Sequence, residues 1–550
     1  MKDTDPPSYP PTPTSQHSLQ EFDDHELFVI DEESAGLLSQ VDRDVEQVKP
    51  YQHRNSTTLD SRTLLRRLAF LVSFILLGAF VVPSIFNSSI PRKQLVCDTF
   101  DNRKLRSNGT HMYKKSSIIV SIDGLRYVSP LTEYTWLLIW ACIRRADYLD
   151  RGLTPHLLAI SKDGLRAKSM KPVFPTLTFP NHWALMTGLY AESHGIVANN
   201  FWDPHTGNEF HYNKIESCWN STWWYGEPMW ETAEKAGIRT ANLMWPGPPT
   251  TSTGASSTYF VPWQDKIPMK VKHDKIMQWI DMPMHERPQF IMAYEPSLDQ
   301  AGHSKGPTSD LVNQVLAEVD QFAKDLHDSL EARNLTDIFD LVFVSDHGMT
   351  DTSNPEWIFI DDILEEGFEL IEHEDGWPAM GLRFSPGTNV SHYLNVLRNA
   401  AHLSNGKFDV YTHETMPERW HFAHNDRIAP IYVVPRMGYA LTNRIENSTG
   451  MSKGNHGYDN DEPSMQAMFV AHGPFASVLK TIHGASVSKG SMLSHFLSRP
   501  NKGWHSTSNE VYVMDTFENV EVYNLMMKLL GIEAHAAKTN GTAGFWDKYF

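Results

Sequence analysis

The sequence predicts an α/β protein whose catalytic part is built on a doubly wound, mostly parallel β-sheet. The chain has 550 residues, of which 41% are hydrophobic, so it can bury a large core. From about residue 112 onward, short β-branched runs alternate with helical patterns, the order that produces parallel strands covered by helices on both faces. Two of these runs end directly in residues that can bind metals. Ligands bind at the carboxyl ends of strands in such folds, so a site is expected there.

The expected elements follow from local patterns. Apolar, β-branched runs bounded by turn residues predict strands over 118–122, 240–244, 290–294, 341–345 and 467–471. Between them, apolar residues recur at helical spacing, which predicts helices over 309–332 and 520–530. No internal repeat is visible, so we expect one large α/β domain with room for a small additional one.

The first part of the chain has a different composition. Residues 1–62 are proline-rich at the start and acidic later, so they cannot bury enough apolar surface to fold and are expected to form a disordered cytosolic tail. Within this tail, Pro6-Pro7-Ser8-Tyr9 matches the type of segment that WW domains bind. Leu37-Leu38, downstream of an acidic residue, resembles a sorting signal. A chance match is the alternative for both.

A transmembrane anchor is expected over 63–87. Residues 68–86 contain no charge and are about long enough to cross a bilayer, whereas a buried core helix is the alternative. Arginines just before this segment favour a cytosolic amino terminus. We therefore expect a single-pass type II membrane protein of the secretory pathway. Its lumenal stalk would span 88–111, and its catalytic domain would be extracellular or lumenal, at the plasma membrane or the vacuole. Glycosylation sequons on that side fit this topology: Asn87, Asn108, Asn220, Asn334, Asn389, Asn447 and Asn540.

Charge and cysteine content narrow the function classes. The formal net charge of −18 argues against a general nucleic-acid binder, so no polymer partner is expected. Nucleotide substrates stay open, because bound divalent cations can invert the local field. Cys97, Cys142 and Cys218 are too few for a disulfide framework and form no Cys-x-x-Cys zinc motif.

Candidate metal ligands lie next to strand ends and glycine turns. An aspartate closes the first predicted strand, and an Asp-His pair closes the fourth. An aspartate and a histidine four residues apart can share one face of a helical turn after the third, and another histidine lies in a glycine-rich loop. These residues are Asp123, Asp346, His347, Asp299, His303 and His456. Mixed carboxylate and imidazole ligands suit zinc, and this set could hold two ions. For any one histidine taken alone, an ordinary surface or hydrogen-bonded role is the alternative.

A hydroxyl group is expected to carry the chemistry. Thr178 lies in the run Pro172-Val-Phe-Pro-Thr-Leu-Thr-Phe-Pro, where prolines restrict the backbone. A threonine hydroxyl is a weak nucleophile unless a base or a metal activates it, which the candidate ligands could do. Thr176, earlier in the same run, is expected to be dispensable for the reaction. His182, His194 and His472 are interpreted as structural.

Longer motifs carry a family resemblance. They are Thr178-Phe-Pro-Asn-His, Thr187-Gly-Leu-Tyr, Asp299-Gln-Ala-Gly-His303, Ser345-Asp-His-Gly-Met349 and Asn455-His-Gly-Tyr458. In combination they resemble the type I phosphodiesterase/nucleotide pyrophosphatase family of the alkaline-phosphatase superfamily. The resemblance covers nearly everything after residue 112. It implies a sheet of alkaline-phosphatase type in a catalytic domain over 112–536, followed by a C-terminal tail over 537–550.

The resemblance also implies roles for single residues. One zinc ion would be held by Asp299, His303 and His456, and the other by Asp123, Asp346, His347 and the Thr178 oxygen. Asn199 matches a phosphate-contacting asparagine, and Trp245 and Tyr259 resemble aromatic residues that flank a nucleoside base. Ordinary core packing is the alternative for those two aromatic residues. Leu177 departs from relatives that have lysine there, so any extra positive charge on the phosphate is missing.

The implied reaction is hydrolysis of phosphodiester or pyrophosphate bonds in nucleotides, for example ATP to AMP and pyrophosphate, through a phosphothreonine at Thr178. A phospholipid or choline-type phosphodiesterase and a phosphomonoesterase of the same superfamily are alternatives. A catalytically dead binding ectodomain is the non-enzyme alternative, against which the complete ligand set argues. A sulfatase is excluded because no Cys- or Ser-x-Pro-x-Arg motif contains one of the three cysteines.

Residues 127–145 interrupt the family pattern. Relatives resemble Asp-Gly-Phe-Arg-Ala-Asp-Tyr-Leu without interruption, whereas here an apolar, tryptophan-containing segment separates Arg126 from Ala146. Connections after a strand in α/β units are usually about two to six residues long. We therefore predict that the segment is a retained intron in the gene model; a functional flap over the site is the alternative.

Overall fold

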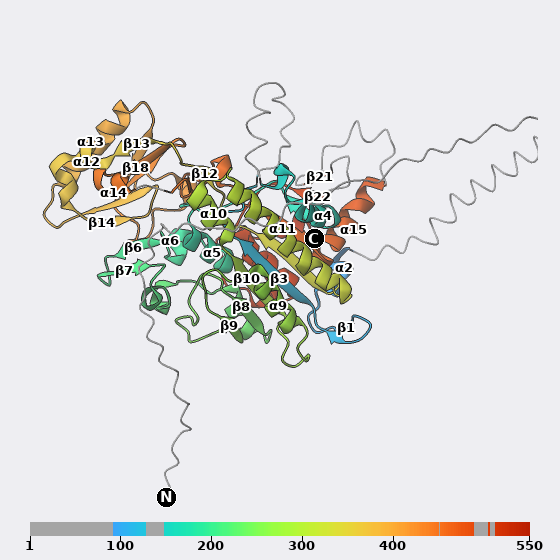
Figure 1. The fold of residues 1–550 in the computed structure, drawn as a ribbon. Coiled ribbons are helices and arrows are strands. Elements are labelled where there is room, and N and C mark those ends of the chain that lie inside the picture. Colours follow the sequence, from blue (N-terminus) through green and yellow to red (C-terminus); the bar gives the residue numbers. More distant parts are fainter. Residues whose placement is uncertain (1–91, 128–147, 450–451, 489–503, 507–511) are drawn as a thin grey trace, which may run out of the picture. The chain divides into compact units, whose positions relative to one another are not determined.

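A mixed sheet of nine strands forms the centre of the described part of the chain, in the order β21-β22-β4-β20-β11-β3-β10-β8-β9 (Figure 1). The structure is a computed structural model that describes residues 92–127, 148–449, 452–488, 504–506 and 512–550. Strands β11, β3, β10, β8 and β9 run parallel to one another, whereas β20 is antiparallel to both of its neighbours. The parallel half is the half that ends in the predicted ligands.

All five predicted strands are present. The strands of the central sheet are β3 (Ser116–Ile122), β4 (Leu165–Ala167), β8 (Thr240–Leu243), β9 (Tyr259–Val261), β10 (Phe290–Glu295), β11 (Phe339–Val344), β20 (Phe469–His472), β21 (Trp504–Ser506) and β22 (Tyr512–Met514). The antiparallel direction of β20 was not predicted. A parallel strand needs a long crossover, usually a helix, to bring the chain back to its starting edge. The chain reaches β20 through the short helix η5 (Pro463–Met465) and enters from the carboxyl edge.

Helices cover both faces of this sheet, as the doubly wound prediction required. On one face, Ile118 and Val120 of β3 belong to a core with α4 (Pro155–Asp163), α9 (Met269–Ile280) and α11 (Asp310–Ala332). On the other face, Ile119 belongs to a core with α5 (Thr178–Thr187), α8 (Met229–Lys235), α15 (Pro474–Ser488) and α16 (Glu521–Leu529). Successive side chains of a strand alternate between faces, so one apolar run supplies both cores. Helices α11 and α16 are the two predicted from periodicity.

A smaller antiparallel sheet, which was not predicted, lies between the Asp346-His347 pair and His456 in the sequence. Its strands are β14 (Ile371–Asp375), β15 (Met380–Phe384), β17 (Ile431–Pro435) and β16 (Phe408–Tyr411) in spatial order. It has its own hydrophobic core, to which α12 (Ile360–Leu364) and α13 (Val390–Leu403) contribute. Both helices lie near β14 in Figure 1. Two strand pairs lead into and out of this region: β12 (Thr350–Asp351) with β19 (Gly454–Asn455), and β13 (Glu356–Phe359) with β18 (Tyr439–Thr442).

The remaining described elements are short apart from α2 and α10. They are α2 (Arg92–Phe100), β1 (Arg106–Ser107), β2 (Met112–Tyr113), η1 (Leu149–Arg151), β5 (Met170–Lys171), α6 (Ala191–His194), β6 (Asn200–Asp203), β7 (Asn208–His211), α7 (Ile215–Cys218), η2 (Ser221–Trp223), α10 (Ser297–Lys305), η3 (Glu365–Leu370), η4 (Glu418–Trp420), α14 (Arg444–Thr449), β23 (Phe517–Glu518), η7 (Glu533–His535) and η8 (Phe545–Lys548).

The ends of the predicted catalytic domain differ from expectation. Phe100, within the predicted stalk, is buried in the core, and Arg92 donates a hydrogen bond to the carbonyl of Asp547 at 2.9 Å. Tyr549 and Phe550, within the predicted C-terminal tail, are buried as well. Residues 92–111 and 537–550 therefore pack as parts of the folded unit, because their aromatic side chains fill its core.

The membrane prediction concerns residues that the structure does not describe. A helix long and apolar enough to span a bilayer is not found in the described ranges. The tail 1–62 and the anchor 63–87 lie outside those ranges, as do residues 128–145 of the predicted insertion. Tyr127, the first residue of that insertion, is described: it is buried, and its backbone N–H donates to the carbonyl of Gln466.

Candidate metal centre and active site

The predicted ligands converge at the carboxyl ends of three adjacent parallel strands. Asp123 follows β3 directly, and Asp346 and His347 follow its neighbour β11. On the other side of β3, strand β10 leads into α10, which carries Asp299 and His303 one helical turn apart. Because β3 lies between β10 and β11, these side chains meet at one edge of the sheet.

The first ligand group consists of Asp123, Asp346 and His347, whose ligand atoms all lie within 4.8 Å of one another. His347 Nε2 lies 3.0 Å from Asp346 Oδ2 and 3.4 Å from Asp123 Oδ1. Gly124 makes this approach feasible: its backbone N–H donates to Asp346 Oδ1 at 3.2 Å, and its φ of +67° suits glycine. A Cβ at that position would lie 3.1 Å from a carboxylate oxygen of Asp299.

The second ligand group consists of Asp299, His303 and His456, again within 4.8 Å of one another. His303 Nε2 lies 3.4 Å from Asp299 Oδ2 and 3.0 Å from His456 Nε2. The two groups adjoin, because the rings of His347 and His456 stack with centroids 3.5 Å apart. The six side chains thus form two adjoining groups, each of which could hold a metal ion.

Backbone carbonyls orient all three imidazoles. His303 Nδ1 lies 2.8 Å from the Gly454 carbonyl, His456 Nδ1 lies 2.8 Å from the Thr176 carbonyl, and His347 Nδ1 lies 2.9 Å from the Gly348 carbonyl. A carbonyl can only accept, so each Nδ1 carries the proton and donates it. Each Nε2 therefore offers a lone pair to its group, the usual arrangement of a metal-binding histidine.

The charge balance of the site fits divalent cations. Asp123, Asp299 and Asp346 are buried, and each has one fully buried oxygen without a hydrogen-bond donor: Asp123 Oδ1, Asp299 Oδ1 and Asp346 Oδ2. Burial raises the pKa of Asp123, and the charges of Asp346 and Asp299 raise it further. Burial also lowers the pKa of His456, which favours the neutral, ligating form. Buried carboxylates require compensating positive charge, and bound metal ions would supply it.

Thr178 lies beside the first group. Its Oγ1 is 3.2 Å from His347 Nε2, and it is the first residue of α5, after Leu177 in extended conformation. A helix amino terminus favours anions such as phosphate. Asn199, half-buried, accepts a hydrogen bond from the Phe179 backbone N–H at 3.0 Å through its Oδ1, which leaves its Nδ2 group as a donor.

A hairpin holds Asn199 in place. Strands β6 and β7 pair directly after this residue, and Tyr212, which follows β7, donates its backbone N–H to the Asn199 carbonyl at 3.1 Å. The hairpin also contacts the small sheet. Trp202 of β6 stacks on His373 of β14 with ring centroids 3.8 Å apart, and its backbone N–H donates to Asp375 Oδ1 at 2.9 Å.

The two aromatic residues expected to flank a base do not form such a site. Trp245 is 3% exposed and packs in the core, where its ring contacts that of His182. Tyr259 on β9 pairs with Ala241 of β8, which pairs with Ile291 of β10, which in turn pairs with Ile118 of β3. These residues lie near the amino ends of their strands. Its hydroxyl donates to the carbonyl of Glu286, before β10 begins. Tyr259 thus lies toward the edge of the sheet opposite the ligands.

Three residues that support the site were missed from the sequence. Thr176, expected to be dispensable, accepts a hydrogen bond from Gly457 N–H at 2.8 Å and donates to the Tyr458 carbonyl at 3.0 Å. His182 contacts both the Thr178 carbonyl and Asp346, and the Tyr294 hydroxyl donates to Asp123 Oδ2. Only the spacing of His182, one helical turn after Thr178, was visible in the sequence.

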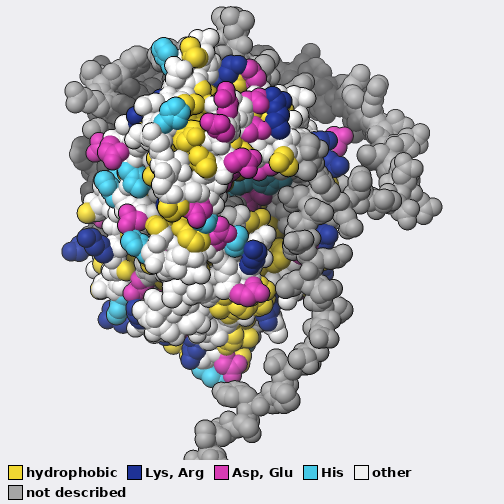
Figure 2. Space-filling view, turned by 90° about the vertical axis from the view of Figure 1, so that its left-hand side faces the viewer, with side chains coloured by type: hydrophobic (Ala, Val, Ile, Leu, Met, Phe, Trp, Pro, Cys, Tyr) yellow, Lys and Arg dark blue, Asp and Glu magenta, His cyan; other side chains and the backbone are white. Residues whose placement is uncertain are grey.

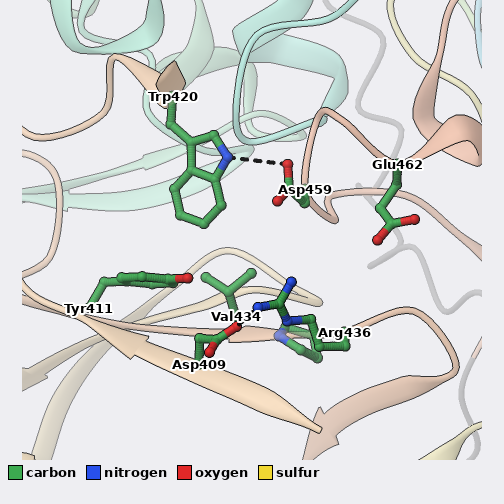
Figure 3. A pocket seen from close by; sticks show the side chains of 8 residues that line it. Asp409, Tyr411, Trp420, Val434, Arg436, Asp459 and Glu462 are labelled. Atoms are coloured by element: carbon green, nitrogen blue, oxygen red, sulfur yellow. Dashed lines mark hydrogen bonds and ion pairs between the residues drawn. The ribbon is translucent and has the colours of Figure 1, made fainter. Parts of the chain in front are cut away.

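A small cavity beside residues 456–462, here called the His456 loop, does not contain any of the candidate site residues. It is lined by residues of the small sheet and of the loop that follows His456, including Trp420, Asp459 and Arg436 (Figure 3). Its volume of about 10 Å³ holds no more than a water molecule. Trp420 donates to Asp459 at 3.2 Å and stacks on Phe174 at 4.0 Å, so this contact braces the threonine-bearing segment.

Comparison with known proteins agrees with this geometry. A family model described as type I phosphodiesterase/nucleotide pyrophosphatase matches residues 117–459. An uncharacterised pyrophosphatase/phosphodiesterase of Schizosaccharomyces pombe is 35% identical over 413 residues, which are 72% of this chain and 80% of that protein. Human ectonucleotide pyrophosphatase/phosphodiesterase family member 1 is 35% identical over 408 residues, which are 73% of this chain and 40% of that protein.

A solved structure is also similar. Murine ectonucleotide pyrophosphatase/phosphodiesterase 5, an inactive threonine-to-alanine variant in complex with AMP, superposes with a TM-score of 0.64 at 28% identity. The match covers 79% of this chain and 100% of that chain. With the site geometry, these matches show that the chain belongs to the type I phosphodiesterase/nucleotide pyrophosphatase family of hydrolases.

Proposed function

We propose that the protein hydrolyses phosphodiester and pyrophosphate bonds of nucleotides, converting ATP to AMP and pyrophosphate, with two zinc ions and Thr178 as the nucleophile. The observation that carries the proposal is the position of the Thr178 hydroxyl, 3.2 Å from His347 Nε2 and at the amino terminus of α5. Asp123, Asp346 and His347 would hold one ion, and Asp299, His303 and His456 the other. The AMP complex of the murine relative agrees with a nucleotide substrate.

The reaction would proceed by two in-line displacements at phosphorus. Zinc ions held by the two ligand groups would neutralise phosphate oxygens and lower the pKa of an attacking hydroxyl or water. Thr178 Oγ1 loses its proton to solvent and bonds to the α-phosphorus, while the bond to the leaving pyrophosphate breaks and the pyrophosphate takes the electron pair. Water then attacks the phosphothreonine, releases AMP and returns a proton to Thr178. The Asn199 Nδ2 group and the amino terminus of α5 stabilise the negative charge that develops on the phosphoryl oxygens.

An aromatic pair next to the nucleophile is a better base site than Tyr259. Phe179 directly follows Thr178 and is half-buried, and Tyr212 is 41% exposed, with the two ring centroids 5.4 Å apart. Aromatic faces stack on any nucleobase, at about 1–3 kcal/mol per base. We place the nucleoside on this pair, which also lies beside Asn199.

Turnover of defined substrates tests the proposal. Wild-type protein should hydrolyse the nitrophenyl ester of thymidine 5′-monophosphate and leave nitrophenyl phosphate intact, and its first products from ATP should be AMP and pyrophosphate. Thr178→Ala should lower turnover by several orders of magnitude, as loss of a nucleophile does in other covalent enzymes. Thr178→Ser keeps a hydroxyl and should retain part of the activity.

Other products would identify other reactions. ADP and orthophosphate as first products would indicate a monoesterase-like pocket, and preferential cleavage of lysophospholipids would indicate a lipid phosphodiesterase. Undiminished turnover by Thr178→Ala would rule out the covalent route.

A polymer substrate is not expected. On the described part of the face in Figure 2, acidic and basic side chains are interspersed without a continuous basic area.

We also propose that residues 63–87 anchor the protein with its catalytic domain outside the cytosol, at the plasma membrane or in the vacuole. The names of several relatives as ectonucleotide enzymes support this placement. Resistance of the full-length protein to alkaline extraction from membranes, with glycosylation of the catalytic side, is the expected result. A WW-domain protein is proposed to bind Pro6–Tyr9, and Tyr9→Ala should weaken that binding.

A further inference from the structure

A buried imidazole joins the nucleophile to a metal ligand. His182 lies on the second turn of α5, is 0% exposed, and neither ligates an ion in the proposed arrangement nor touches the phosphate path. Its Nδ1 is 2.9 Å from the Thr178 carbonyl and 3.3 Å from Asp346 Oδ2. We propose that His182 is a positioning residue that holds Thr178 and Asp346 in one geometry, a role that rests on the proposed function.

The hydrogen bonds of His182 determine its tautomer. The Thr178 carbonyl can only accept, so Nδ1 carries the proton and faces two oxygen atoms at once. Nε2 is then unprotonated and accepts from the Ser121 hydroxyl, 2.9 Å away on β3. The Ser121 hydroxyl donates to Nε2, and this hydrogen bond keeps the Nδ1 edge of the ring turned toward the site.

The two oxygens of the Asp346 carboxylate have different surroundings. Its Oδ1 accepts from the backbone N–H groups of Gly124 and His347, at 3.2 and 3.0 Å. Its Oδ2 has no hydrogen-bond donor of good geometry and lies between His182 Nδ1 and His347 Nε2. His347 Nε2 carries a lone pair and cannot donate, so of these two neighbours only the His182 N–H can attract Oδ2.

Packing prevents water from replacing the imidazole. The ring makes edge contacts with Trp245 and Tyr294, with centroids 5.3 and 4.9 Å away, and both rings are buried. The Tyr294 hydroxyl in turn donates to Asp123 Oδ2. Tyr294 and His182 thus contact one oxygen of each carboxylate in the first ligand group, Asp123 Oδ2 and Asp346 Oδ2, and Ser121 holds the His182 ring from its other nitrogen.

Substitutions that keep or lose the Nδ1 donor test the role. Asparagine places an amide N–H near the position of Nδ1, glutamine places one near Nε2, and leucine offers neither. Metal-free full-length protein is titrated with Co²⁺, whose visible absorption reports the geometry of its ligands. The Co²⁺ affinity of His182→Asn should stay close to that of wild type. At the first ligand group, His182→Gln and His182→Leu should bind Co²⁺ about 10- to 100-fold more weakly than wild type. With saturating metal, kcat should fall in the same order while KM stays within a few-fold.

His194→Asn is the matched control. His194 is also 0% exposed and also contacts a carbonyl of α5, that of Pro180, yet it touches no ligand of either group. Its Co²⁺ affinity and spectrum should match those of wild type. If His182→Asn binds Co²⁺ no more tightly than His182→Gln, His182 acts only through packing. This comparison holds even if His182→Leu fails to fold.

Failure of the proposed function has a different signature. If wild-type protein binds Co²⁺ but cleaves no nucleotide ester, the proposed reaction is wrong, and the order of the Co²⁺ affinities still decides the positioning role. If wild type is active and all three His182 variants keep its Co²⁺ affinity, spectrum and kcat, the positioning role is refuted and the proposed function stands.

Discussion

Thr176→Val removes one hydroxyl from the segment that carries the nucleophile and leaves the side-chain volume almost unchanged. The hydroxyl is 0% exposed and serves two backbone groups of the His456 loop, Gly457 N–H and the Tyr458 carbonyl, at 2.8 and 3.0 Å. Both groups belong to buried residues, so water does not replace the lost partner.

The expected loss of stability follows from these two contacts. A buried polar group that loses its partner costs about 1–3 kcal/mol, so the variant should lose about 2–6 kcal/mol of unfolding free energy. Thr176→Ser keeps the hydroxyl and removes one buried methyl group, which costs about 1 kcal/mol. The two variants therefore separate the hydrogen bonds from the packing at one position.

Urea denaturation of zinc-loaded and metal-free protein measures both effects. The Val variant should unfold at lower urea than the Ser variant with an unchanged slope. Zinc should also stabilise the Val variant less than wild type, because the altered loop carries His456 and the stability that binding adds grows with the logarithm of the metal affinity. A Val variant as stable as wild type beside a weaker Ser variant would refute the hydrogen-bond argument.

Three further outcomes are expected. Exhaustive chelation should abolish nucleotide hydrolysis, and zinc should restore it better than magnesium because half of the ligands are imidazoles; full activity with no detectable metal would contradict the metal site. Burial lowers the pKa of His194 to about 3, so the unfolded chain binds one more proton than the folded one between that value and its ordinary 6.5. Stability should therefore fall as the pH drops below 6.5, and His194→Gln should flatten the slope of unfolding free energy against pH; an unchanged slope would remove His194 as the cause. Transcript sequencing should show a mature messenger without the codons for 127–145, and a dominant message that contains them would make this segment part of the protein.

The parts of the fold that the sequence predicts are those encoded locally. Buried parallel strands appear as continuous β-branched runs, and β3 and β11 were readable for that reason. Asp123 follows the end of β3, and Asp346 and His347 follow the end of β11. If the two strands are parallel, these residues must lie at the same edge of the sheet. The helical turn that joins Asp299 to His303 is equally local.

The parts that were missed depend on distant contacts. The partners of Thr176 lie in the His456 loop, far along the chain, and no local pattern reveals that pairing. Strands β14 and β15 of the small sheet are short and partly exposed, so they lack a continuous apolar run. Tyr259 was chosen by family likeness, whereas its strand register with Ala241 determines its true position.

The hairpin from Asn200 to His211 links the small sheet to the residues beside the nucleophile. Its base holds Asn199 and Tyr212 beside the nucleophile, while Trp202 rests on His373 of the small sheet. A substitution at Trp202 or His373 would therefore act on Asn199 and Tyr212 through the hairpin, without replacing any of the six candidate metal ligands. Laboratory evolution toward other nucleosides could begin at these two positions.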